Sequence, residues 1–234
     1  MSCCILLFMA LKILQGFVVA VLLVTQVTCL IGLDTAPILS FQSTFDCLKA
    51  QGYQFSNVRA FSLEGIDLDL SVKDTLIYSQ KAGLRTELFI RPCRGKLAKA
   101  QIDIIILAIA EQYYEKLWLY LEHNPNKNCE WGNDHKANCH YVRTMIDAVK
   151  YFNQKSGIYT TKAFYKHMFG TEGCDLSDLP LIYEQPDGTP SFDGYEQIGN
   201  WTTPYGKMFQ SSQYACGVTI NKIYEKSDSN LATQ

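Results

Sequence analysis

Short apolar segments alternate with helical patterns from residue 30 to residue 160 of this 234-residue chain, and this alternation constrains the fold most strongly. Segments 30–34, 55–61, 84–90, 117–122 and 157–160 have the composition of strands. Helical patterns occupy segments 45–51, 69–81, 97–114 and 136–155. Strands that alternate with helices in this way are typical of βαβ units with a parallel sheet.

The chain changes character after residue 160. Further strands are expected near 181–183 and 207–210, with few helices between them. The whole pattern predicts an α/β fold, an irregular TIM-barrel-like (β/α) barrel of five βα units followed by helix-poor strands. We expect one domain over residues 30–226 and a short C-terminal tail at 227–234.

Residues 1–29 resemble a secretory signal peptide, with a mostly apolar stretch up to Val24 in which Lys12 is the one charge, and small residues near Cys29 for cleavage. An uncleaved membrane anchor is the competing interpretation. Polar residues and Gly16 interrupt the uncharged stretch that follows Lys12 and leave 17–24 as its unbroken apolar run, which is shorter than the roughly 20 residues of a spanning helix. The sequence therefore predicts a protein that is secreted or delivered to the lysosomal lumen, without stable membrane association after cleavage.

Six cysteines follow this N-terminal segment, and an even number in a secreted chain predicts three disulfides. They are Cys47, Cys93, Cys129, Cys139, Cys174 and Cys216. Pairing of Cys129 with Cys139 would close a polar loop and is the preferred local pair, although the sequence leaves the other pairings open. The cysteines lack the spacing of a structural zinc site, so no metal is expected. The sequon at Asn200 is consistent with secretion.

Charge and motif content exclude several classes of function. The formal net charge is −2 and the basic residues are scattered, apart from a group between Arg91 and Lys99 that is typical of a solvated helix start. Nucleic acid is therefore not an expected partner. The chain has no GxSxG elbow and no glycine-rich phosphate loop, so we expect neither a serine hydrolase nor a bound cofactor.

Polar residues lie in or at the ends of the predicted strands, where barrel enzymes carry their chemistry. Asp34 ends the first strand, Arg59 lies late in the second and Glu87 lies within the third. Glu122 ends the fourth strand, and Tyr159 lies in the fifth. Acids that converge at one mouth could supply a general acid and a charge stabiliser for glycosidic cleavage. The alternative is that they cap helices or are simply solvated.

Several short strings occur in a characteristic order between Leu33 and Tyr159. They are Leu33-Asp34, Thr44-Phe45-Asp46-Cys47-Leu48-Lys49, Val58-Arg59-Ala60-Phe61, Pro92-Cys93-Arg94-Gly95-Lys96, Leu121-Glu122-His123-Asn124-Pro125, Asn138-Cys139 and Gly157-Ile158-Tyr159. Together with the six cysteines, they resemble the nematode and amoebal lysozymes of glycoside hydrolase family 25. The resemblance covers nearly the whole chain after the N-terminal segment.

This resemblance implies hydrolysis of the β-1,4 bond after N-acetylmuramic acid in peptidoglycan, so that a bacterial cell-wall glycan is the expected partner. In the family, one strand ends in Asp-x-Glu, where Glu is the general acid and Asp assists attack by the substrate's N-acetyl group. Glu122 falls on that Glu and Asp34 falls on the first-strand acid. The resemblance assigns substrate contacts to Arg59, Glu87, Tyr120, Tyr159 and Tyr183.

Several residues depart from the family pattern. Tyr120 replaces the Asp of the motif, Asn221 replaces a late Asp, Met208-Phe209 replaces a Gln-Tyr pair, and Ile182 replaces an aromatic residue beside Tyr183. A tyrosine, with a reference pKa of about 10, does not supply negative charge near neutral pH.

We therefore expect a monomeric antibacterial or digestive lysozyme-like protein with weak activity. A non-catalytic carbohydrate-binding protein that keeps the cleft is the alternative, and an unrelated role on an inherited scaffold is a third.

Overall fold

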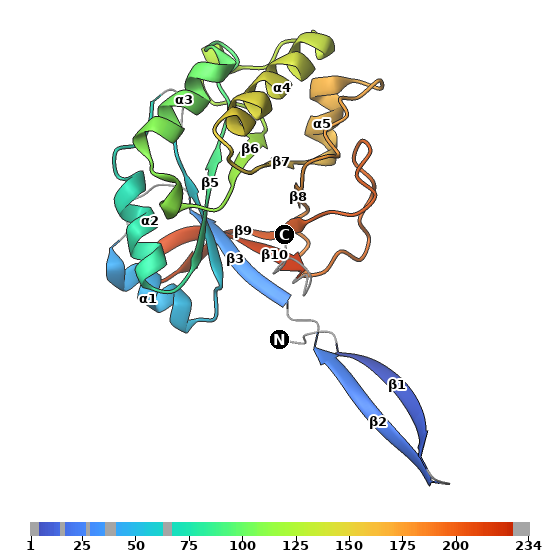
Figure 1. Ribbon diagram of the computed structural model, residues 1–234. Coiled ribbons are helices and arrows are strands. Elements are labelled where there is room, and N and C mark those ends of the chain that lie inside the picture. The colour runs from blue at the N-terminus through green and yellow to red at the C-terminus, as the bar shows by residue number, and fades with distance from the viewer. Residues whose placement is uncertain (1–4, 15–16, 27–28, 36–40, 63–66, 227–234) are drawn as a thin grey trace.

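The computed structural model describes residues 5–14, 17–26, 29–35, 41–62 and 67–226 (Figure 1). Eight of its strands form a closed barrel in the order β10-β3-β4-β5-β6-β7-β8-β9. These strands are β3 (Cys29–Thr35), β4 (Phe55–Arg59), β5 (Arg85–Ile90), β6 (Leu117–Leu121), β7 (Ser156–Thr160), β8 (Leu181–Glu184), β9 (Gly206–Ala215) and β10 (Val218–Lys226). Neighbours from β3 to β9 are parallel, whereas β10 runs antiparallel to both β9 and β3. The predicted barrel is confirmed.

The α-helices lie on the outside of the barrel, one after each strand from β3 to β7 (Figure 1). They are α1 (Gln42–Ala50), α2 (Val72–Lys81), α3 (Ala98–Ala108), α4 (His135–Tyr151) and α5 (Lys162–Phe169). Two short 3₁₀ helices, η1 (Glu111–Tyr113) and η2 (Lys127–Cys129), lie in the connections on either side of β6. No helix lies between β8 and β9 in this fully described stretch, so the helix-poor final portion is also confirmed.

Two apolar layers hold the barrel together. Outside the strands, the predicted stripe of α4, including Val142, Met145 and Val149, is fully buried against them. The barrel interior is filled by a second cluster with large side chains from successive strands, among them Trp118 and Tyr159. Because successive strand residues point to opposite faces, each strand contributes to both layers. The barrel is therefore a packed core whose chemistry is confined to its ends.

Three disulfides join the six predicted cysteines: Cys47–Cys216, Cys93–Cys129 and Cys139–Cys174. The expected local pair of Cys129 with Cys139 is wrong. Cys129 lies in η2, beside the segment that follows β5, and the backbone N–H of Arg94 donates to its carbonyl at 3.1 Å. Cys139 lies on α4 and joins the segment after α5 instead. Both cysteines thus link segments that only the folded barrel brings together.

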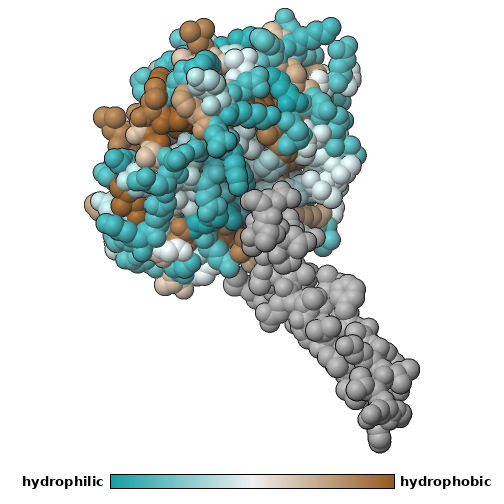
Figure 2. All heavy atoms as spheres, viewed as in Figure 1, coloured by the Kyte–Doolittle hydropathy of each residue, from teal (hydrophilic) through white to brown (hydrophobic). Residues whose placement is uncertain are grey.

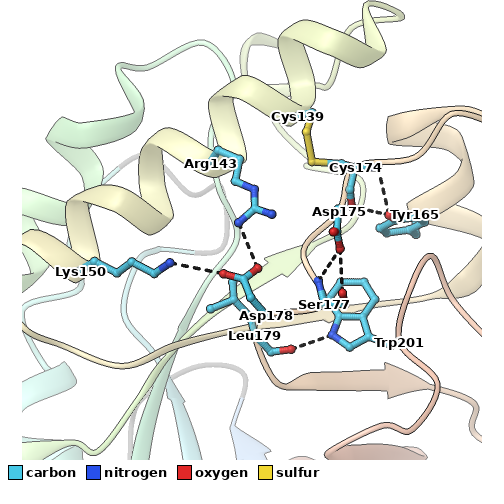
Figure 3. Close-up of polar contacts among 10 residues, drawn as sticks. All are labelled: Cys139, Arg143, Lys150, Tyr165, Cys174, Asp175, Ser177, Asp178, Leu179 and Trp201. Carbon is cyan, nitrogen blue, oxygen red and sulfur yellow. Dashed lines mark hydrogen bonds and ion pairs between the residues drawn. A yellow bond between two sulfur atoms is a disulfide. The ribbon is translucent and has the colours of Figure 1, made fainter.

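The segment that leads into β8 is fixed by a group of polar contacts shown in Figure 3. The Cys139–Cys174 disulfide ties its start to α4. Asp178 accepts from Arg143 at 3.1 Å and from Lys150 at 3.4 Å, both on α4. The indole N–H of Trp201 donates to the Leu179 carbonyl at 2.7 Å. These contacts set the position of β8, which carries a residue of the candidate site.

Strands β1 (Ile5–Leu14) and β2 (Phe17–Gln26) pair with each other in a two-stranded antiparallel sheet, which is distinct from the barrel sheet. The interpretation of residues 1–29 as a signal peptide stays a prediction, and the expected tail at 227–234 lies outside the described residues. Of the helices in the described part of the chain, none is long and apolar enough to cross a membrane.

The surface of the barrel is mainly hydrophilic, with hydrophobic areas between (Figure 2). One such area lies over α3, where Ile104 and Leu107 are exposed.

Candidate active site

The carboxyl ends of the parallel strands bring the candidate residues to one end of the barrel, here called the mouth. The mouth carries Asp34 from β3, Arg59 from β4, Tyr120 from β6, Tyr159 from β7 and Glu184 from β8. Arg91 and Glu122 directly follow β5 and β6. Hydrogen bonds, ring contacts and electrostatic interactions connect these side chains.

Asp34 and Tyr159 form the buried floor of the mouth. The Tyr159 hydroxyl donates to Oδ2 of Asp34 at 3.1 Å, and the two residues are 0% and 3% exposed, respectively. The pKa of Asp34 is raised to about 7, mainly by burial and also by the nearby Glu184 carboxylate, while hydrogen bonds from Tyr159 and Asn221 oppose the shift. Asp34 therefore titrates near neutral pH.

Tyr120 lies above this floor. Its ring stacks on the Tyr159 ring, with centroids 4.3 Å apart and an interplanar angle of 23°. Its hydroxyl donates a hydrogen bond to Oε1 of Glu184. Burial and the neighbouring carboxylates of Glu184 and Glu122 raise the pKa of Tyr120 further above its already high reference value. Tyr120 is thus a fixed hydrogen-bond donor to Glu184 at the mouth.

Glu184, the last residue of β8, was not predicted as a site residue. Burial raises the pKa of its carboxyl group to about 7. The Glu122 carboxylate adds to this upward shift, whereas the hydrogen bond from Tyr120 and the charge of Arg91 oppose it. Glu122, Arg91 and Glu184 therefore share one electrostatic environment. The sequence contained the relevant signal, because Glu184 ends a strand as Asp34 and Glu122 do, but the expected strand stopped at Tyr183.

Glu122 forms an ion pair with Arg91, a second residue whose place in the site was not predicted. The Glu122 side chain remains 26% exposed, so its carboxylate is open to a ligand at the mouth. The guanidinium of Arg91 also lies 5.6 Å from the centroid of the Tyr120 ring. Arg91 was interpreted as part of a solvated basic group, whereas the structure places it among the acids of the mouth.

Arg59 lies beside these groups and is 7% exposed. Its Nε donates to the Phe61 carbonyl at 2.9 Å. Burial and the like charge of Arg91 lower the pKa of its guanidinium, while Asp69 and Asp34 raise it. Arg59 is therefore a second cation close to the mouth acids.

Glu87 does not join the mouth, and the expectation that its carboxylate points there is wrong. Its Oε1 lies 3.3 Å from Arg85 and 3.8 Å from Lys116, and its Oε2 accepts from Trp118 at 2.5 Å. These partners belong to the amino ends of β5 and β6, where Glu87 lines a cavity of about 860 Å³ with Tyr205. The reason is position, because β5 continues for three residues beyond Glu87, to Ile90.

Tyr183 faces away from the Tyr120–Tyr159 stack. Its ring packs against that of Tyr195 at 4.9 Å, and its hydroxyl has no hydrogen-bond partner among the described residues. Tyr183 nevertheless lines a cavity of about 300 Å³ that also includes Glu184, Thr161 and Lys162. We call this space the β8 cavity. Glu184 therefore belongs both to the mouth and to the lining of the β8 cavity.

The described residues contain no group of three or more His, Cys, Asp or Glu side chains placed to hold a metal ion. The mouth instead combines several carboxyl groups with Arg59, Arg91 and two stacked tyrosines. Such a set can donate a proton, place negative charge near a developing cation and bind sugar hydroxyls.

Comparison with known proteins agrees with this geometry. A family model described as Lysozyme-like protein 1 matches residues 25–209. A probable GH family 25 lysozyme 4 of Dictyostelium discoideum is 26% identical over 180 residues, which cover 74% of this chain and 80% of the relative. Lysozyme-like protein 5 of Caenorhabditis elegans is 26% identical over 191 residues, covering 78% and 85%.

The fold has close structural counterparts as well. The family GH25 lysozyme from Aspergillus fumigatus superposes with a TM-score of 0.71 at 16% identity, over 88% of this chain and 97% of that structure. The likeness shows the fold class, a closed α/β barrel. The family match is specific, and the chain belongs to the lysozyme-like proteins of glycoside hydrolase family 25.

Proposed function

We propose that this protein is a secreted muramidase that hydrolyses the β-1,4 bond after N-acetylmuramic acid in bacterial peptidoglycan, in antibacterial defence or digestion. The observation that carries the proposal is the convergence of Asp34 and Glu122 with the Tyr120–Glu184 pair at the mouth of a family 25 barrel. Three disulfides are consistent with an oxidising compartment.

Hydrolysis of a glycosidic bond needs a proton donor for the leaving oxygen and negative charge near the anomeric carbon. Glu122 is the proposed proton donor, because it matches the general acid of the family and its carboxyl group is open to the mouth. Asp34 is the proposed floor carboxylate beneath the sugar. The proposed sugar-contacting residues are Arg59, Tyr159 and Tyr183. Glu87 is not among them, because it lies near the amino ends of β5 and β6, away from the mouth.

Weak turnover is part of the proposal. Tyr120 places a neutral hydroxyl and a ring where the motif has a carboxylate. Loss of one preorganised electrostatic group typically lowers a rate by about 100- to 1000-fold. The experiment is a turbidity assay on purified bacterial walls with the mature protein, combined with Glu122→Gln. Clearance by wild type that the variant lacks supports the proposal.

A non-catalytic carbohydrate-binding protein is the second candidate. The observation that favours it is the ion pair between Arg91 and Glu122, which engages the carboxylate of the proposed proton donor. Saturable binding of wall fragments without release of reducing ends would establish this second function and contradict the first.

A further inference from the structure

Glu184 and Glu122 occupy equivalent places on the two strands that flank β7. Leu121 of β6 is in register with Thr160 of β7, and Thr160 is in register with Tyr183 of β8. The next residues along β6 and β8 are Glu122 and Glu184, which therefore leave the barrel at the same level. Their backbones are two strands apart, roughly 10 Å.

Both side chains also lie on the interior side of the barrel. Tyr120 and Ile182 pack in or against the interior cluster. Residues two positions apart on a strand share a face, so Glu122 lies on the face of Tyr120 and Glu184 on the face of Ile182. The electrostatic effect of Glu122 on the pKa of Glu184 agrees with this convergence. The two carboxyl groups thus face the same space.

Glu184 is held in place and still reachable. The Tyr120 hydroxyl fixes one carboxylate oxygen, and the anchored segment before β8 fixes its backbone. Glu184 also lines the β8 cavity with Thr161 and Lys162. Asp34, by contrast, is 3% exposed and accepts the Tyr159 hydroxyl.

We propose that Glu184 is a catalytic residue of this site, and that its carboxylate supplies from β8 the negative charge that position 120 lacks on β6. This inference rests on the proposed function. Glu122 transfers its proton to the glycosidic oxygen, and the electron pair of the breaking C1–O bond goes to that oxygen. The substrate's N-acetyl oxygen attacks C1, and the Glu184 carboxylate stabilises the resulting positive charge. Water then opens this intermediate and returns a proton to Glu122.

The proposal predicts a specific pH dependence. Because burial raises the pKa of Glu184 to about 7, the anionic form becomes the major one only above that pH. Glu122 raises this pKa, whereas Arg91 and the hydrogen bond from the Tyr120 hydroxyl lower it. Asp34 and Tyr159 also interact electrostatically with Glu184, and Lys162 lines the β8 cavity with it. Activity that needs the anion rises as pH increases through about 7, and Glu184→Gln removes this rise.

The test measures kcat, KM and the pH profile on purified peptidoglycan for wild type, Glu184→Gln and the control Glu111→Gln. Glu111 lies in η1, near the amino end of β6. Glu184→Gln is expected to lower kcat by about 100-fold or more, with KM changed only a few-fold. Its thermal midpoint stays near that of wild type, since a glutamine oxygen can still accept from Tyr120. Glu111→Gln is expected to keep wild-type kinetics.

A second variant tests the role of the charge itself. Adding Tyr120→Asp to Glu184→Gln places a carboxylate back on β6 and is expected to restore the rate by about tenfold or more over Glu184→Gln alone. If wild type is active and the kcat of Glu184→Gln lies within twofold of it, or the pH profile of the variant is unchanged, the proposed role of Glu184 is overturned while the proposed function stands. Wild type without cleavage at any pH overturns the proposed function, and this role with it.

Discussion

The Tyr120 hydroxyl donates a hydrogen bond to the Glu184 carboxylate, across the intervening strand β7. Tyr120, which we propose stands at the Asp position of the Asp-x-Glu motif, is therefore hydrogen-bonded to another acid of the mouth. The departure at position 120 is coupled to the residue at position 184, and the two positions have to be considered together.

Tyr120→Asp as a single variant is expected to raise the rate of peptidoglycan cleavage by about tenfold. The new carboxylate lies two residues from Glu122 on the same face of β6 and adds negative charge beside the reacting sugar. Initial rates on purified walls at several pH values measure this effect. A folded variant whose rate equals that of wild type would show that position 120 does not limit turnover.

Asp34 should make stability depend on pH. Its pKa is about 7 in the folded protein against a reference of 3.8, so between these values the folded state holds a proton that the unfolded state has lost. The Asp34 contribution to stability is full below about pH 4 and is lost as pH rises through about 7. Each tenfold difference in proton affinity between the folded and unfolded states corresponds to about 1.4 kcal/mol.

Asp34→Asn removes this titration. The thermal midpoint of the variant minus that of wild type should become more positive from pH 5 to pH 8, since only wild type then has to ionise a buried carboxyl group. Calorimetry or circular dichroism melts at four pH values would measure the difference. A difference independent of pH would contradict the raised pKa of Asp34.

Glu87→Gln is expected to affect stability and spare activity. The substitution leaves Arg85 and Lys116 without the buried carboxylate that lies between 3.3 and 3.8 Å from them. Arg85 keeps its ion pair with Glu225 at 2.5 Å, so the loss in the free energy of unfolding should stay below the roughly 3 kcal/mol typical of a buried charge left without a partner. The rate below the melting transition should stay within twofold of wild type. A large fall in kcat for a folded variant would return Glu87 to the active site.

The Cys47–Cys216 disulfide should stabilise the protein most. It joins α1 to the turn between β9 and β10 over a sequence separation of 169, against 35 for Cys139–Cys174. In the chain-entropy account, this difference in loop length corresponds to about 1.4 kcal/mol in the free energy of unfolding. Urea unfolding of Cys47→Ala/Cys216→Ala and of Cys139→Ala/Cys174→Ala would measure it. Equal losses in both variants would show that loop length does not decide their effect.

Local patterns in the sequence predicted β3 to β7 and their first four helices, because periodicity within a segment records which side faces the core. The fifth helix, α5, has only eight residues and was not located, although five βα units were expected. Strand β10 was also not predicted. It pairs antiparallel with the first barrel strand, a contact between chain segments far apart in sequence.

The candidate site could likewise be predicted only where the signal lies within one segment of the chain. Asp34 and Glu122 follow from the rule that barrel chemistry lies at strand ends. The prediction failed for Glu87 because this residue is not at the strand end: β5 continues three residues further, to Ile90. Glu184 and Arg91 were missed because their roles depend on partners from other strands, Tyr120 and Glu122. The wrong disulfide pair has the same origin, since tertiary contacts determine which cysteines meet.

The central claim is that the mouth of this barrel hydrolyses peptidoglycan through Glu122. The most direct measurement is analysis of the reducing ends released from purified peptidoglycan by wild type and by Glu122→Gln. The account predicts new N-acetylmuramic acid reducing ends with wild type and at least a 100-fold lower yield with the variant. Equal release by both proteins, or no release by a folded wild type that binds the glycan, would contradict it.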